Sequence, residues 1–139
     1  MAKALLSYYD AVFADLDGVV YEGGKAIDYA VPALEKVSEL GLKLAFVTNN
    51  SSRKPATIAE QIAGYGLKVS EEQVVSSGQT GVELLSTLIP AGSKVLVVGG
   101  EGLRTYTQQA GFELVDDSTA NPAAVIQGFS PDVGWKHLS

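Results

Sequence analysis

The fold of this chain is decided by the stretch Phe13-Ala14-Asp15-Leu16-Asp17-Gly18-Val19-Val20-Tyr21. An apolar run leads directly into two acidic residues that are separated by one leucine. On an extended backbone, residues two apart point to the same side, so the Asp15 and Asp17 carboxyl groups would emerge together. In open α/β sheets, ligands bind at the carboxyl ends of the strands. The stretch therefore predicts a buried strand with a ligand site at its end.

The chemistry of this stretch favours a divalent cation and a phosphate group. Two neighbouring carboxylates repel each other unless a proton or a cation lies between them, and Mg²⁺ prefers oxygen ligands and phosphate oxygens. Gly18 would let the backbone approach a phosphate without a side chain in the way. An alternative stays open at this point, because acidic residues followed by glycine also form ordinary turns and helix caps.

A second polar run follows another apolar strand. Residues 46–53 read Phe-Val-Thr-Asn-Asn-Ser-Ser-Arg, and a helix is expected after them. Such a run presents the Thr48 hydroxyl and several backbone N–H groups near a helix N-terminus, which suits an anion. A simple helix cap is the alternative. If the two strands are neighbours in a sheet, the acids and the Thr48-Asn49 loop meet at one edge.

Strands and helices alternate along the chain at short spacing. We expect strands over residues 11–16, 44–48, 74–76, 95–98 and 123–127. Apolar and polar residues do not alternate within these strands, which predicts that both faces of the sheet are covered. We expect helices over residues 32–40, from about 55 to 65, over 80–88 and over 103–110, three of them ended by Gly41, Gly66 and Gly111. The pattern predicts an α/β fold with a Rossmann-like parallel sheet and right-handed crossovers.

Composition narrows the class of function. Hydrophobic residues make up 46% of the 139 residues and charged residues 19%, which fits an ordered globular protein. The net charge of −6 argues against a nucleic-acid partner, whereas a small phosphorylated substrate is compatible with it. There is no cysteine, no apolar run long enough to cross a bilayer, and no apolar core of signal-peptide length at the N-terminus. We therefore expect no membrane association and a cytoplasmic location.

The two polar runs resemble motifs of the haloacid dehalogenase superfamily of phosphohydrolases. Asp15-Leu16-Asp17-Gly18-Val19 is similar to the first motif of that superfamily, and Thr48-Asn49-Asn50-Ser51 is similar to the second. The form of the second motif is typical of the branch with the NagD-type and 4-nitrophenyl phosphatases and the pyridoxal and phosphoglycolate phosphatases. The likeness continues through Ser76-Ser77-Gly78, residues 97–103 and Gln127-Gly128-Phe129, so it covers most of the chain.

The resemblance implies a Mg²⁺-dependent phosphomonoester hydrolase that acts through an aspartyl-phosphate intermediate on a small phosphorylated metabolite. By this likeness, Asp15 is the nucleophile and Asp17 is the general acid and base. Thr48 and Asn49, with the Gly18 backbone, would bind the phosphoryl group. The Asp15 carboxylate and the Asp17 backbone carbonyl would hold Mg²⁺.

The resemblance also implies catalytic residues that the two motifs quoted above do not contain. The superfamily uses a lysine in a third motif and an acidic metal ligand in a fourth, and in this branch both follow an inserted cap domain. We therefore predict an incomplete core over residues 1–91 and the first half of a C2-type α/β cap over residues 92–139. Asp116 and Asp117 are expected to lie in a loop of the cap. The incomplete sheet would leave an open edge and exposed apolar surface, which would favour a homo-oligomer.

Three other classes of function remain as alternatives. A dinucleotide-binding module would use Gly100 and Gly102, but Thr105 occupies the third glycine position of its fingerprint. A phosphoacceptor signalling domain would need a lone aspartate after a later strand, and none follows residues 44–48. A catalytically inactive fragment, or a module that binds metal or a partner without turnover, is the main alternative for the chain as it stands. The sequence does not identify the phosphate ester.

Overall fold

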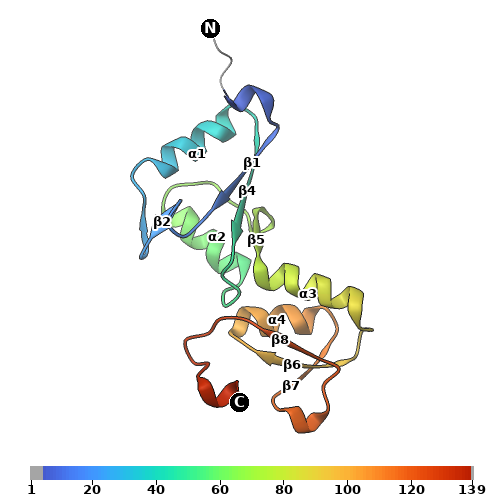
Figure 1. The fold of residues 1–139 in the computed structure, drawn as a ribbon. Helices are drawn as coiled ribbons and strands as arrows, with labels where there is room; N and C mark the ends of the chain where they lie inside the picture. The colour runs from blue at the N-terminus through green and yellow to red at the C-terminus, as the bar shows by residue number, and fades with distance from the viewer. Residues whose placement is uncertain (1–4, 139) are drawn as a thin grey trace. The chain divides into compact units, whose positions relative to one another are not determined.

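The protein has an α/β fold, as the sequence predicted. A computed structural model describes residues 5–138 (Figure 1). The strands are β1 (Ala11–Asp15), β2 (Tyr21–Glu22), β3 (Lys25–Ala26), β4 (Lys43–Thr48), β5 (Val74–Ser76), β6 (Lys94–Val98), β7 (Glu113–Val115) and β8 (Ala124–Gln127). The helices are α1 (Ala30–Glu39), α2 (Pro55–Gly64), α3 (Ser77–Leu88) and α4 (Glu101–Gln109), and short 3₁₀ helices cover Leu5–Tyr8, Glu71–Gln73, Ser118–Ala120 and Trp135–His137.

The described residues form two compact units. The first unit holds residues 5–48 and 55–75, and the second holds residues 49–54 and 76–138. The segment 49–54, which joins β4 to α2 in the chain, therefore belongs to the second unit. The assignment of residues 92–139 to a cap domain stays a prediction.

The first unit is built on a sheet with the strand order β1-β4-β5. β1 and β4 are parallel, with Ala14 opposite Phe46 and Asp15 opposite Val47 (Figure 1). The carboxyl ends of the two strands therefore meet at one edge of the sheet. This is the condition under which the sequence predicted that the acids and Thr48 come together.

In the described part of the chain, helices cover one face of this sheet, which corrects the expectation that both faces are covered. Side chains alternate between the faces of a strand. One set forms a core with α1 and α2 that includes Ala14, Leu16, Leu34, Val37, Leu44, Phe46, Ile58, Ile62 and Val74. On the alternate positions, the exposed fractions are 73% for Phe13, 37% for Val47 and 40% for Val75.

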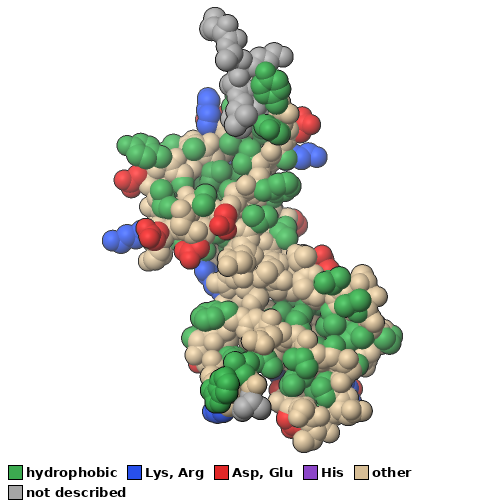
Figure 2. All heavy atoms as spheres, in the orientation of Figure 1, with side chains coloured by type: hydrophobic (Ala, Val, Ile, Leu, Met, Phe, Trp, Pro, Cys, Tyr) green, Lys and Arg blue, Asp and Glu red, His purple; other side chains and the backbone are tan. Residues whose placement is uncertain are grey.

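The predicted open edge and exposed apolar surface are therefore present in the first unit. Among residues 5–138, β1 pairs in this sheet with β4 alone. Apolar side chains are visible on the surface of this unit in Figure 2. Burial of such a face against another surface would be favourable at roughly 25 cal/mol per Å² of apolar area.

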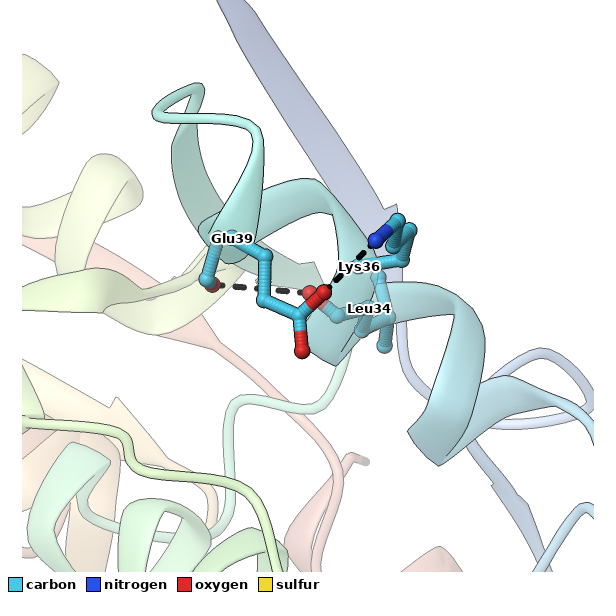
Figure 3. Close-up of polar contacts among 4 residues, drawn as sticks. Leu34, Lys36 and Glu39 are labelled. Atoms are coloured by element: carbon cyan, nitrogen blue, oxygen red, sulfur yellow. Dashed lines mark hydrogen bonds and ion pairs between the residues drawn. The ribbon is translucent and has the colours of Figure 1, made fainter.

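Helix α1 shows how the sequence pattern sets the orientation of a helix. Its buried residues are Leu34 and Val37, which face the core. On its outer side, Lys36 Nζ lies 2.8 Å from Glu39 Oε2 (Figure 3). The two side chains are 65% and 64% exposed, so this ion pair contributes little to stability.

Left-handed glycines end three helical segments, as the sequence predicted. The φ angles are +77° at Gly41, +105° at Gly66 and +84° at Gly111. Glycine adopts this conformation without the steric penalty that a Cβ atom brings. Each glycine therefore turns the chain out of a helix toward the next segment.

The second unit contains a three-stranded parallel sheet with the order β7-β6-β8. Its buried core comprises Val82 and Leu85 of α3, Leu103 of α4, Val95 and Val97 of β6, and Phe112. The alternation of strand and helix that the sequence showed is therefore repeated in this unit. Within residues 5–138, none of the helices has the length and apolar character needed to span a bilayer.

The sequence did not predict strands β2, β3 and β7 or the exact starts of α3 and α4. β2 and β3 are two residues each and pair as a hairpin around Gly23 and Gly24, and β7 is a strand of three residues, so none of them carries a detectable periodicity. α3 and α4 begin at Ser77 and Glu101, earlier than expected, because Gly78 and Gly102 lie inside the helices. The predicted loop at Asp116-Asp117 is confirmed as a bend after β7.

Candidate phosphate-binding site

Asp15 and Thr48 lie at the carboxyl ends of neighbouring strands in the first unit. Asp15 is the last residue of β1 and lies opposite Val47, so Thr48 is the next residue along β4. Asp15 is exposed, whereas Thr48 is only 8% exposed. The Asp15 Oδ1 atom accepts the backbone N–H of Leu16 at 2.8 Å. One carboxylate oxygen is thereby oriented by the backbone.

A tight turn follows β1 and fixes the position of Asp17. The Leu16 carbonyl accepts the N–H groups of Val19, Val20 and Tyr21 at 3.2, 2.8 and 3.1 Å. Gly18 has a φ of +78° and donates its N–H to the Tyr21 carbonyl at 2.8 Å. A side chain at that φ would be strained, so the turn requires glycine. Asp17 is held between the buried Leu16 and this glycine, and it is exposed to solvent.

The loop 49–54 has its own hydrogen bonds in the second unit. Asn50 Oδ1 accepts the Ser52 N–H at 2.9 Å and the Ser52 hydroxyl at 2.7 Å. The Ser77 hydroxyl, at the start of α3, donates to the Asn49 carbonyl at 2.8 Å. The side chain of Asn50 thus closes a turn inside the loop, and Ser77 anchors the end of the loop that follows Thr48.

Four of the predicted site residues therefore lie in one unit. Asp15, Asp17 and Gly18 are at the end of β1, and Thr48 is at the end of β4, all in the first unit. Asn49 follows Thr48 directly in the chain but belongs to the second unit. The sequence did not point to Ser77 as the residue that anchors the loop, although small hydroxyl residues at the end of β5 were a visible signal.

The donor atoms at the end of β1 fit a hard divalent cation. Asp15 and Asp17 offer oxygen atoms, and Mg²⁺ in proteins is usually held by one or two carboxylates together with water and substrate phosphate. Among residues 5–138, no three or more His, Cys, Asp or Glu side chains gather closely enough to hold a metal. These two residues would therefore supply only part of the coordination of such an ion.

The acidic pair after β7 is engaged elsewhere. Asp116 Oδ1 lies 3.0 Å from Arg104 Nη2. Asp117 Oδ1 accepts the Thr119 N–H at 2.8 Å and caps a 3₁₀ helix. The hydrogen bonds from the Thr119 side chain and backbone lower the pKa of Asp117 below its ordinary value. Both acids thus have local structural partners.

A hollow of about 420 Å³ lies in the second unit and is lined by Gln127, Gly128, Phe129, Ser130 and Val133. None of the predicted catalytic or phosphate-binding residues lines it. Its wall is formed by the segment that follows β8, which the sequence analysis identified only as part of the family likeness.

Comparison with protein families gives a match over most of the chain. The family model of the haloacid dehalogenase-like hydrolases matches residues 12–113. This range includes Asp15, Asp17, Thr48 and Asn49. The branch expected from the sequence also appears among the similar structures, which include NagD from Escherichia coli and a p-nitrophenyl phosphatase from Archaeoglobus fulgidus.

Curated relatives are phosphatases. The chain is 34% identical to D-glycerol 3-phosphate phosphatase from Mycobacterium tuberculosis over 99% of its own length and 38% of the relative. It is 30% identical to acid sugar phosphatase from Staphylococcus saprophyticus over 94% of its own length and 49% of the relative. The chain therefore spans less than half the length of these two relatives.

Solved structures agree with the sequence relatives. The magnesium complex of glycerol phosphate phosphatase from Mycobacterium tuberculosis has a TM-score of 0.89 at 34% identity, over 99% of this chain and 41% of that one. A crystal structure of the same phosphatase holds calcium, with a TM-score of 0.87. NagD from Escherichia coli has a TM-score of 0.79 at 28% identity, over 93% of this chain and 50% of that one.

Proposed function

We propose that this chain supplies the nucleophile and the phosphate-binding loop of a phosphomonoester hydrolase. The premise is that the chain belongs to the haloacid dehalogenase-like hydrolases. The observation that carries the proposal is the register of β1 and β4, which puts Asp15 opposite Val47 and therefore next to Thr48. A nucleophilic carboxylate and a hydroxyl donor at one sheet edge are two of the groups that phosphoryl transfer to an aspartate uses. The chain's similarity to two curated phosphatases supports the same reaction.

In the first half-reaction, a carboxylate oxygen of Asp15 attacks phosphorus. The new O–P bond forms as the P–O bond to the leaving group breaks, and the carboxyl group of Asp17 gives its proton to the leaving oxygen. The Thr48 hydroxyl and the Asn49 backbone N–H donate hydrogen bonds to the phosphoryl oxygens, on which negative charge develops. The product is an aspartyl-phosphate and a free alcohol.

In the second half-reaction, water attacks the same phosphorus. Asp17, now a carboxylate, takes one proton from the water, and the P–O bond to Asp15 breaks. Inorganic phosphate leaves, and both carboxyl groups return to their starting protonation states. One residue can serve as acid and then as base because its protonation state changes between the two halves.

The residues that would hold Mg²⁺ are Asp15, through its carboxylate, and Asp17, through its backbone carbonyl. When bound, the ion supplies positive charge that offsets repulsion between the Asp15 carboxylate and the phosphate. The magnesium complex of a similar phosphatase supports this choice of ion. The names of the relatives, a glycerol 3-phosphate phosphatase and an acid sugar phosphatase, point to small phosphorylated metabolites as the substrate class.

The test is hydrolysis of p-nitrophenyl phosphate by the 139-residue chain with and without Mg²⁺. Asp15→Asn is compared with Asp10→Asn, which removes an acid just before the other end of β1. We expect Mg²⁺-dependent turnover that is lost in Asp15→Asn and kept in Asp10→Asn. Equal turnover in both variants would refute the role of Asp15.

A catalytically inactive fragment is the second candidate, and the length comparison favours it. The chain covers 38% of the glycerol 3-phosphate phosphatase and 49% of the acid sugar phosphatase. A folded chain that shows no turnover above Asp15→Asn, yet changes the Asn49 amide signal on addition of phosphate and Mg²⁺, would support this candidate. In that case the chain binds phosphate and lacks groups needed for turnover.

A further inference from the structure

The loop 49–54 is enclosed by four glycines of the second unit. Gly78 lies in the first turn of α3, Gly100 and Gly102 lie at the start of α4, and Gly128 follows β8. We call these four residues the glycine cradle. An ideal Cβ atom built on any of them would come within 3.3 Å of the loop, so the loop and the cradle are in direct backbone contact.

Gly102 makes the closest approach to the backbone of the loop. A Cβ atom there would lie 2.8 Å from the carbonyl carbon and oxygen of Arg53 and 2.9 Å from its nitrogen. The Gly102 N–H also donates to the Ser52 carbonyl at 3.1 Å. Gly102 lies inside α4, where alanine is the better helix former. The glycine is therefore required by the contact with Arg53, and the conformation of the helix does not require it.

Gly100 and Gly128 approach the serines of the loop. A Cβ atom at Gly100 would lie 2.9 Å from Ser52 Cβ and 3.1 Å from Ser52 Cα. A Cβ atom at Gly128 would overlap Ser51 Oγ and lie 3.1 Å from Ser51 Cβ. The next residue, Phe129, donates its N–H to the same Ser51 Oγ at 3.1 Å. Ser51 is therefore held by a hydrogen bond and by close packing at once.

Polar contacts reach both ends of the loop. The Ser77 hydroxyl donates to the Asn49 carbonyl at 2.8 Å, and Lys54 Nζ lies 2.6 Å from Glu101 Oε1. Together with the Gly102 N–H, these contacts come from the first turns of two helices. The loop is thus restrained at its first residue, in its middle and at its last residue.

We propose that Gly100, Gly102 and Gly128 are positioning residues that fix the backbone of loop 49–54, so that the Asn49 N–H is preset for a phosphate. The inference rests on the proposed function for its ligand. The claim about loop order does not depend on the proposed function, because it concerns only the absence of side chains at these three positions. Preset N–H donors bind an anion without having to be ordered first.

The test uses amide hydrogen exchange and phosphate binding on the full 139-residue chain. The variant is Gly102→Ala, and the control is Gly81→Ala in α3, where a Cβ atom would meet only Ile126 Cδ1 at 3.7 Å. We expect exchange of the loop amides to rise by about tenfold or more in Gly102→Ala and to stay unchanged in Gly81→Ala. Unchanged protection of the Val95 and Val97 amides shows that the core is intact.

A second readout is the affinity for inorganic phosphate in the presence of Mg²⁺, followed at the Asn49 amide. We expect Gly102→Ala to weaken binding by about tenfold relative to Gly81→Ala, the same factor as the loss of loop protection. If neither the wild type nor the control binds phosphate, the proposed function fails, and the exchange data still decide the positioning role. Equal loop protection in Gly102→Ala and Gly81→Ala would overturn the inference.

A rescue experiment covers the case in which Gly102→Ala does not fold. Gly128→Ala alone should raise loop exchange, because its Cβ atom overlaps Ser51 Oγ. Ser51→Ala removes that oxygen and also the acceptor of the Phe129 N–H, so each background carries its own reference. Gly128→Ala should cost about threefold less loop protection when it is added to Ser51→Ala than when it is added to the wild type. An equal cost in the two backgrounds would contradict direct contact between the cradle and the loop.

Discussion

Phe13 and Phe46 lie on opposite faces of the same sheet, and their exposed fractions are 73% and 0%. Phe46 is packed in the core of the first unit, whereas Phe13 lies on the uncovered face. We expect Phe46→Ala to lower the free energy of unfolding by about 3–5 kcal/mol, and Phe13→Ala to change it by about 0.5 kcal/mol or less. Urea unfolding of the two variants measures the difference. Similar losses in both would mean that the face with Phe13 is covered in solution.

The uncovered face also predicts self-association. Phe13, Val47 and Val75 are exposed apolar residues on the three strands of the sheet, which also has an open edge at β1, and such surfaces favour contact with other chains. We expect Phe13→Glu to shift the chain toward the monomer in sedimentation velocity. Leu84→Glu in α3, where the leucine is 61% exposed, is the control and should leave the distribution as it is. A wild-type chain that is monomeric at all concentrations would refute the prediction.

Gly64 and Gly66 offer a matched pair two residues apart. Gly64 ends α2 and has open space around its Cβ position, whereas Gly66 has a φ of +105°. Gly66→Ala should lower the free energy of unfolding by about 1–2 kcal/mol, because an L-residue is strained there. Gly64→Ala should raise it by up to about 1 kcal/mol through helix propensity. Thermal unfolding of both variants tests the opposite signs, and the same sign in both would contradict the argument.

The ion pair between Lys54 and Glu101 predicts a pH dependence. The hydrogen bond from Lys54, and then its positive charge, lower the pKa of Glu101 below its ordinary value of 4.5. A lowered pKa in the folded state stabilises the fold above the ordinary pKa, and this contribution is lost as the pH falls through the lowered value. The effect is small because Glu101 is exposed.

The measurement compares the melting temperatures of the wild type and Glu101→Gln between neutral pH and acid. We expect the wild type to be slightly more stable at neutral pH and the difference to vanish as the pH falls well below 4.5. A difference that grows toward acid would mean that the pKa shift has the opposite sign. Glu83→Gln, an exposed acid of α3, is the control.

The sequence predicted strands β1 and β4 well because they depend on local pattern, whereas the roles of the residues at their ends stay a prediction. The apolar runs before Asp15 and Thr48 became β1 and β4, and the register brought their ends to one edge. The coverage of the sheet could not be predicted in the same way. Phe13 and Val47 are as apolar as their buried neighbours, so the sequence alone does not distinguish an uncovered face from a buried one.

The role of the glycines was also beyond local pattern. In the sequence, Gly100 and Gly102 match the first two glycines of a dinucleotide fingerprint. In the structure they contact Ser52 and Arg53, far away in the sequence. A glycine that admits a distant backbone looks the same, in its local sequence, as one that forms a turn. Only the three-dimensional structure distinguishes a glycine that contacts a distant backbone from one that forms a turn.

The bond from the Phe129 N–H to Ser51 Oγ joins residues that are 78 positions apart. At about 5–20 residues per second, synthesis of that interval takes roughly 4–16 s. During this time the loop 49–54 exists without this partner, while the synthesis of α2 and β5 completes the elements of the first unit. The loop that would bind phosphate therefore gains this contact later than the strands of the first unit are made.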